Sequence, residues 1–135
     1  MEMYIGLKTV GLVPMNRKDY NDYRGWNLPA DEDGTDEGYL VEYMDGGKPN
    51  HPDHKGYISW SPKEQADNAY RPVEGMPFGT ALELLNRGGK VARKGWNMFL
   101  IRDPYIRVVT VDGIVNEPWI PSKSDVISED WTEIA

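Results

Sequence analysis

Two tryptophans in the C-terminal half stand beside polar and basic residues that suit recognition of a flat, charged ligand. Aromatic faces stack on heterocycles, amide and carboxylate groups bind the polar edges of a base or a ribose, and cations bind phosphate. Arg93 and Lys94 alternate along a predicted strand, so one of the two faces the ligand, and the sequence leaves open which. The predicted ligand-binding residues are Arg93, Lys94, Trp96, Asn97, Trp119, Ser122 and Asp125.

The alternative interpretation is that these tryptophans are core residues of a small domain. For Trp131, which lies in a terminal alternating strand, we favour the core. Turn-like neighbours (Gly95 before Trp96, prolines on both sides of Trp119) instead predict partial exposure of the other two. The basic run from Arg87 to Lys94 has its own alternative as an ordinary solvated face.

Catalysis has weaker support in the sequence. His51 and His54 are the two histidines, and with Asp53 they offer three potential metal ligands within four residues. Proline and asparagine around them predict an exposed turn without a scaffold to bring the ligands together, so we predict no metal site. Because no hydrolase, metalloprotease or phosphate-loop motif occurs, we also predict no catalytic residues and no cofactor.

The C-terminal half is predicted to combine one main helix with short strands. Phe78, Leu82 and Leu85 recur at helical spacing after Pro77, and Gly88 suits a left-handed end to that helix. The predicted strands are Lys90–Arg93, Met98–Arg102, Tyr105–Val111 and Asp130–Ile134, with a hairpin turn at Asp112-Gly113 and a serine-capped helical turn around Asp125–Ser128.

The N-terminal half is predicted to have a similar mixture of elements. We expect a helix over Asn16–Arg24 and a solvated acidic loop over Asp31–Glu37. A second helix is predicted to begin with Ser61 as its cap and Pro62 in its first turn. The predicted strands are Tyr39–Tyr43, Gly56–Trp60 and Tyr70–Val73.

Several landmarks recur in the same order in both halves. Arg24-Gly25-Trp26-Asn27 resembles Lys94-Gly95-Trp96-Asn97, and Trp60-Ser61-Pro62 resembles Trp119-Ile120-Pro121. A degenerate internal duplication would explain this order, and chance similarity of two β-rich segments is the alternative. We therefore predict an α+β protein of small antiparallel sheets and short helices, with an N-terminal module over residues 1–75 and a ligand-binding domain over 76–135.

Composition and charge limit the functional classes. The chain has 135 residues, 15 Lys and Arg against 22 Asp and Glu, and no cysteine. A net charge of −7 argues against general DNA or RNA binding, and the absence of cysteine excludes disulfides and thiolate zinc sites. Short apolar runs and an N-terminus unlike a signal peptide predict a cytosolic protein without a membrane partner. Residues 1–75 carry −6 of the charge, which disfavours a second anion pocket there.

The C-terminal motifs resemble a known family. Residues 76–88, the segment Val91-Ala92-Arg93-Lys94-Gly95-Trp96-Asn97, and Trp119-Ile120-Pro121-Ser122 followed by Asp125 and Trp131 are similar to phage Thoeris anti-defence proteins of the second type. The segment between Phe99 and Tyr105 is shorter here than in members with a long insertion, so any ligand contacts on that insertion are absent. Residues 1–75 look like an extension that precedes this domain.

The resemblance implies a phage immune-evasion protein of the host cytoplasm. Such a protein binds cyclic nucleotide signals of the glycocyclic ADP-ribose class, and in some relatives cyclic dinucleotides, and holds them without degradation. It also implies a homo-oligomer, a dimer or tetramer, with pockets completed by a second chain. Two other classes stay open: a phage protein-interaction module and a phosphodiesterase-like enzyme.

Overall fold

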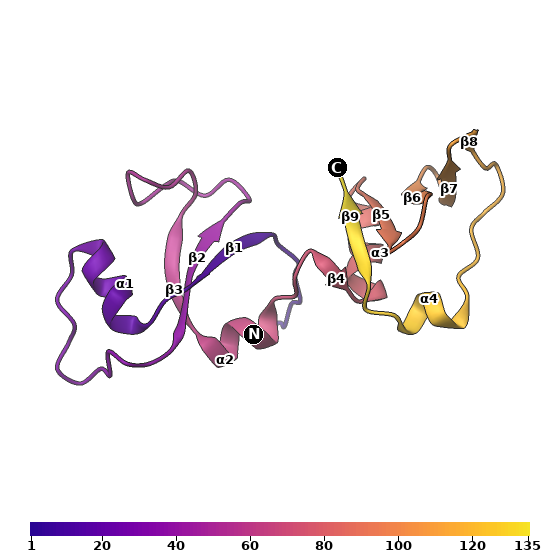
Figure 1. Ribbon diagram of the computed structural model, residues 1–135. Coiled ribbons are helices and arrows are strands. Elements are labelled where there is room, and N and C mark those ends of the chain that lie inside the picture. The colour runs from indigo at the N-terminus through magenta and orange to yellow at the C-terminus, as the bar shows by residue number, and fades with distance from the viewer. The chain divides into compact units, whose positions relative to one another are not determined.

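The computed structural model describes residues 1–135 and divides into two compact units, Met1–Tyr70 and Arg71–Ala135 (Figure 1). Both are α+β units built on antiparallel sheets with short helices, as predicted. The division falls after Tyr70, before the predicted boundary at residues 75 and 76. The difference arises because the strand β4 (Glu74–Met76) crosses that predicted boundary and pairs with the C-terminal strand of the second unit.

The first unit has a three-stranded sheet in the order β1-β2-β3. Its elements are β1 (Val10–Pro14), α1 (Arg17–Arg24), β2 (Gly38–Tyr43), β3 (Ile58–Pro62) and α2 (Lys63–Ala69). Asn16 caps α1 by accepting a hydrogen bond from the Asp19 amide at 2.8 Å, and Gly25 ends the helix with a φ of 74°. The buried core of this unit is Tyr20, Leu40 and Ile58, with Met15 and Trp60 packed against it.

Two local predictions for the first unit are wrong. Ser61 does not cap α2, because it continues β3 and pairs with Tyr39; Pro62 takes the N-cap position, and the helix begins at Lys63. Residues 70–73 form no strand, and the next strand is β4. At Ser61 the pairing of β3 with β2 prevailed over the local capping signal. After residues 70–73, strand pairing begins at Glu74, where β4 pairs with β9.

The second unit has a six-stranded sheet in the order β4-β9-β5-β6-β7-β8. The C-terminal strand β9 (Trp131–Ile134) lies between β4 and β5, so the first and last strands of this unit are neighbours at one edge of the sheet. The remaining elements are α3 (Phe78–Asn86), β5 (Lys90–Arg93), β6 (Phe99–Arg102), β7 (Ile106–Thr110), β8 (Gly113–Ile114) and α4 (Lys123–Ile127).

Most local predictions for this unit are confirmed, with shifts of one to three residues at the element ends. Gly88 ends α3 in the left-handed region with a φ of 87°. The hairpin turn falls at Val111-Asp112 rather than at Asp112-Gly113, because Thr110 pairs with Gly113. Ser122 caps α4, which begins at Lys123.

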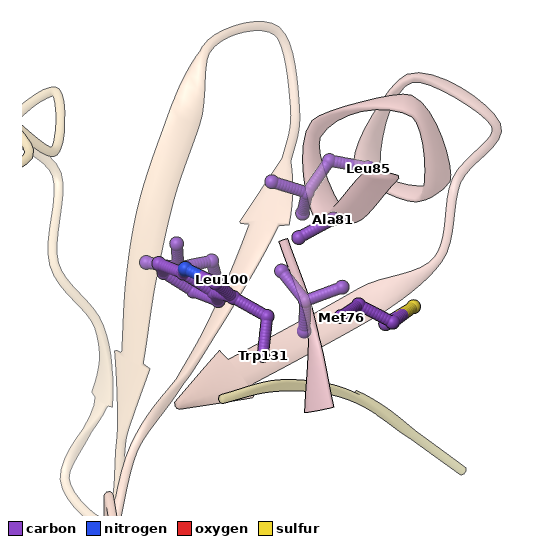
Figure 2. Packing of buried hydrophobic residues seen from close by; sticks show 6 residues of the cluster. Met76, Ala81, Leu85, Leu100 and Trp131 are labelled. Carbon is purple, nitrogen blue, oxygen red and sulfur yellow. The ribbon is translucent and has the colours of Figure 1, made fainter. Parts of the chain in front are cut away.

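The core of the second unit lies between α3 and one face of its sheet (Figure 2). Ala81 and Leu85 of α3 contact side chains of the neighbouring strands, and Trp131 is fully buried at 0% exposure, as predicted. The buried residues of this hydrophobic cluster are Met76, Ala81, Leu85, Val91, Leu100 and Trp131. Since burying a large aromatic side chain is strongly favourable, Trp131 is the principal hydrophobic anchor of this unit.

The predicted internal duplication is wrong at the level of the fold. Gly25 ends a helix, whereas Gly95 follows a strand. Trp60 lies inside β3 and pairs with Leu40, whereas Trp119 lies outside any regular element. Because the two sheets also differ in strand order, the shared landmarks occupy unrelated positions and reflect similar short patterns.

Candidate ligand-binding site

Arg93 is fully engaged within the protein. Its Nε donates to Asp130 Oδ1 at 2.9 Å and its Nη1 to Asp125 Oδ1 at 3.0 Å. Further bonds run from Nη1 to Ser124 Oγ at 3.2 Å, and from Nη2 to Ser128 Oγ at 3.0 Å and to Asp130 Oδ2 at 3.3 Å. A guanidinium has five N–H donors, and all five are used here. Arg93 therefore joins β5 to α4 and to the start of β9 and has no donor left for a phosphate.

The two carboxylates around Arg93 are held in their charged form. Hydrogen bonds from Arg93 and Ser128 lower the pKa of Asp130. Burial acts to raise the pKa of Asp125, but hydrogen bonds from Ser122 and Arg93 outweigh it, and the pKa is lowered overall. The same two aspartates raise the pKa of the Arg93 guanidinium. Arg93, Asp125 and Asp130 thus form a structural ion-pair network, called the Arg93 clamp below.

Ser122 and Asp125 form the capping box of α4. The Ser122 hydroxyl accepts from the Asp125 amide at 3.1 Å, and Asp125 Oδ2 accepts from the Ser122 amide at 2.8 Å. Asp125 is 8% exposed, and its backbone carbonyl accepts the indole N–H of Trp131 at 2.9 Å. Both oxygens of the Asp125 carboxylate are therefore occupied inside the unit, where they bond Arg93 and cap α4.

Trp96 and Trp119 are partly buried and pack edge-on around Trp131. The ring centroids of Trp96 and Trp131 are 5.2 Å apart, those of Trp119 and Trp131 6.1 Å, and those of Trp96 and Trp119 6.4 Å, all in T-shaped geometry. Both outer tryptophans therefore contribute to the core and keep part of their surface exposed.

A hollow of about 640 Å³ lies over the strands β4, β9 and β5. Ala92 and Thr132 are opposite each other in the antiparallel register, and Thr132 also pairs with Glu74. Residues paired in this way share one face of a sheet, so the small Ala92 side chain leaves a depression in the middle. The lining residues are Glu74, Gly75, Ala92, Arg93, Lys94, Gly95, Trp96, Glu129, Asp130, Thr132 and Ile134.

Lys94 is the basic residue that is available at this hollow. Lys94 directly follows β5, where its amide bonds the Asp130 carbonyl at 3.0 Å, whereas the Arg93 side chain is directed to α4. Lys94 is exposed and makes no ion pair, while Glu74, Glu129 and Asp130 supply carboxylates around it. Of the two basic residues between which the sequence left the choice open, Lys94 is the one without a protein partner.

The structure brings three of the seven predicted residues to the hollow: Arg93, Lys94 and Trp96. Asn97 is exposed just beyond it, and Trp119, Ser122 and Asp125 do not line it. Sequence reasoning missed Glu74, Thr132 and Ile134. The alternation of Thr132 and Ile134 can be seen in the sequence. The position of β9 between β4 and β5, which brings these residues to Lys94, cannot be seen there.

A second hollow, of about 510 Å³, lies in the first unit. Its charged lining residues are Asp19, Glu37 and Lys63, and Lys63 is already paired with Asp67 at 2.6 Å. The surroundings of this hollow are acidic, which disfavours an anionic ligand.

The second unit is a small α+β domain whose hollow carries one unpaired cation, Lys94, and a partly exposed tryptophan, Trp96. Residues 76–134 match the family model of the Thoeris anti-defense 2-like domain. Thoeris anti-defense 2 of Bacillus phage SP01 is 35% identical over 81 residues, which covers 42% of this chain and 91% of the phage protein. The chain belongs to the Thoeris anti-defense 2-like family, and the predicted resemblance is confirmed.

Family membership supports a phage anti-defence role for the chain. The matched residues 76–134 contain most of the hollow, and Glu74 and Gly75 lie just before them. No helix in the structure has the length and apolar character needed to cross a membrane.

Proposed function

We propose that this protein binds and sequesters a cyclic nucleotide second messenger without degrading it, acting in the cytoplasm of the infected host. The first candidate ligand class is glycocyclic ADP-ribose, and cyclic dinucleotides are the second. The observation that carries the proposal is the joint position of Lys94 and Trp96 at one hollow inside the family-matched residues.

The dimensions and chemistry of the hollow support a nucleotide. A volume of about 640 Å³ is in the range of small-molecule sites. Lys94 would bind phosphate, the free surface of Trp96 would stack on a base, and the carboxylates of Glu74 and Glu129 would accept ribose hydroxyls. Asn97, next to Trp96, is placed to approach a ligand that extends past the turn at Gly95.

Charge supports completion of this site by a second chain. The hollow has one free cation, Lys94, against the carboxylates of Glu74, Glu129 and Asp130. Because a ligand with two phosphates needs more positive charge than that, the missing cations would come from a second copy. A homo-oligomer of closed symmetry, a dimer or tetramer, satisfies this requirement.

Ligand recovery tests sequestration directly. The full chain is mixed with a stoichiometric amount of each candidate cyclic nucleotide, freed of unbound ligand, and heat-denatured, and the released ligand is analysed by mass spectrometry. We expect an unchanged ligand in an amount close to that of the protein. A chemically altered ligand would contradict sequestration and favour a phosphodiesterase-like enzyme.

Native mass spectrometry of the same mixtures measures oligomer size and ligand stoichiometry together. We expect an oligomer that gains ligand mass in defined steps. A protein that binds none of the nucleotides and instead retains a host or virion protein would favour the interaction-module alternative.

A further inference from the structure

Three side chains of the first unit form a continuous hydrogen-bonded chain that the proposed function does not use. The Tyr23 hydroxyl lies 2.7 Å from Nε2 of His54. Nδ1 of His54 contacts Oε1 of Glu42, and Oε2 of Glu42 accepts the Gly56 amide at 3.3 Å. The order is carboxylate, imidazole, phenol, with a helix, a loop and a strand each contributing one group.

The hydrogen-bond partners determine where the protons lie. The hydrogen bond from His54 lowers the pKa of Glu42, so this group is a carboxylate and accepts only. Nδ1 of His54 must therefore carry a hydrogen. In the tautomer whose other ring nitrogen is unprotonated, Nε2 accepts the hydrogen bond of the Tyr23 hydroxyl. A carboxylate thus orients an imidazole, and the imidazole is positioned to remove a proton from a hydroxyl.

The surrounding contacts hold the three groups in this arrangement. Asn50 pins the loop between β2 and β3 by bonding both the Ile58 carbonyl, at 2.9 Å, and the Ile58 amide, at 2.8 Å. His51 stacks on the Tyr23 ring with centroids 4.5 Å apart and planes 15° apart. Tyr23 remains 38% exposed, so a small molecule can reach it.

We propose that Tyr23 is a nucleophile toward neutral acyl donors, with His54 as its general base and Glu42 as the positioning residue. The phenol oxygen forms a bond to the acyl carbon, the bond from that carbon to its leaving oxygen breaks, and the phenol proton passes to Nε2 of His54. The product is an acylated Tyr23 and the free leaving group. The charge of −6 on residues 1–70 favours a neutral donor over an anionic phosphoryl group.

The test uses the full chain and 4-nitrophenyl acetate, a neutral activated ester. Acetylation of each tyrosine is followed by peptide mass spectrometry over time. Tyr4 is an internal control, because it is 84% exposed and its hydroxyl contacts only Glu2. General-base assistance is typically worth about 10²–10⁴-fold, so we expect Tyr23 to react at least tenfold faster than Tyr4. Equal rates at Tyr23 and Tyr4 in the unmodified protein would overturn the proposal.

Variants then identify the base. His54→Gln is expected to reduce the Tyr23 rate to that of Tyr4, whereas Lys48→Gln, a change at an exposed side chain of the same loop that leaves Nε2 of His54 in place, is expected to retain it. Circular dichroism and the unchanged Tyr4 rate show that each variant is folded and that the reagent is active. A His54→Gln protein that keeps the fast Tyr23 reaction would remove His54 from the assignment.

Discussion

The tryptophans of the two units have different neighbours. In the first unit, cations lie over aromatic rings, with Arg24 4.5 Å from the ring centroid of Trp26 and Arg17 5.0 Å from that of Trp60. In the second unit, three tryptophans pack against one another, and Arg93 is surrounded by carboxylates and hydroxyls. A basic residue near an aromatic ring therefore does not by itself form an anion-binding site.

Availability of the cation separates the two cases. In the first unit, Arg17 also pairs with Glu32, and Lys63 pairs with Asp67 beside the acidic hollow. In the second unit, Arg93 pairs with both nearby aspartates, and Lys94 is left without a partner at the hollow. The comparison therefore predicts that changes in the two units affect stability and ligand binding differently.

The largest expected effect is on the core of the second unit. Trp131→Ala removes a fully buried ring and the hydrogen bond to the Asp125 carbonyl, and we expect it to lower the free energy of unfolding by about 3–5 kcal/mol. Urea unfolding with hydrogen-exchange mass spectrometry measures this loss in peptides of residues 71–135. Trp26→Ala, at a ring 50% exposed in the first unit, is the matched control and should cost far less. Similar losses for both variants would contradict the assignment of Trp131 as the anchor.

The next effect concerns the Arg93 clamp and its dependence on pH. Because the pKa values of Asp125 and Asp130 are lowered in the folded state, their contribution to stability is complete above the unfolded value of about 3.9. It is lost as the pH falls through the lower folded values. Arg93→Met removes the partner shared by both carboxylates, so we expect lower stability at neutral pH and a weaker decline of stability in acid.

Thermal unfolding between pH 7 and pH 2 checks the clamp. The control is Arg87→Met, since Arg87 pairs only with the exposed Glu83 on the surface of α3. An acid decline as steep in Arg93→Met as in the unmodified protein would show that the clamp does not set the pKa values of these aspartates.

Local signals in the sequence predicted most elements, because the deciding groups are close together in the chain. Asn16, Gly88 and the Ser122–Asp125 pair each act within about one helical turn, and their positions near helix ends are confirmed. The site depends on long-range pairing instead. Arg93 meets Asp125 and Asp130 from 32 and 37 residues away, and β9 enters the sheet beside β5. Local patterns carry no information on such pairings.

The same limit explains why the pairing of two predicted ligand-binding residues with each other could not be read from the sequence. In the sequence, Arg93 and Asp125 look like a free cation and a free carboxylate, and the fold pairs them with each other. Arg93 and Lys94 are neighbours in the sequence. Successive side chains of an extended chain point to opposite sides, and only that of Arg93 is enclosed.

A smaller effect is expected on ligand binding when Lys94 is changed. Lys94→Gln keeps most of the side-chain volume and removes the charge, and a hydrogen bond to a charged group is worth about 1.5–3 kcal/mol. We expect about 10- to 100-fold weaker binding of the cyclic nucleotide, with unchanged stability. Calorimetric titration measures the affinity, and Lys123→Gln, on the exposed first turn of α4, is the matched control. Unchanged affinity in Lys94→Gln would exclude Lys94 as the phosphate contact.

The smallest effect is expected at the cation over Trp26. Arg24 lies 4.5 Å from the Trp26 ring centroid and donates to the Tyr20 hydroxyl at 3.4 Å. Exposed cation–aromatic contacts contribute about 0.5–1 kcal/mol, so Arg24→Gln should lower the stability of the first unit by this amount and leave cyclic nucleotide affinity unchanged. Urea unfolding and calorimetric titration measure the two quantities, with Lys48→Gln in an exposed loop as the control. A loss of affinity in Arg24→Gln as large as that in Lys94→Gln would mean that a cation of the first unit binds the ligand. The two units would then no longer differ in whether a cation is available to a ligand.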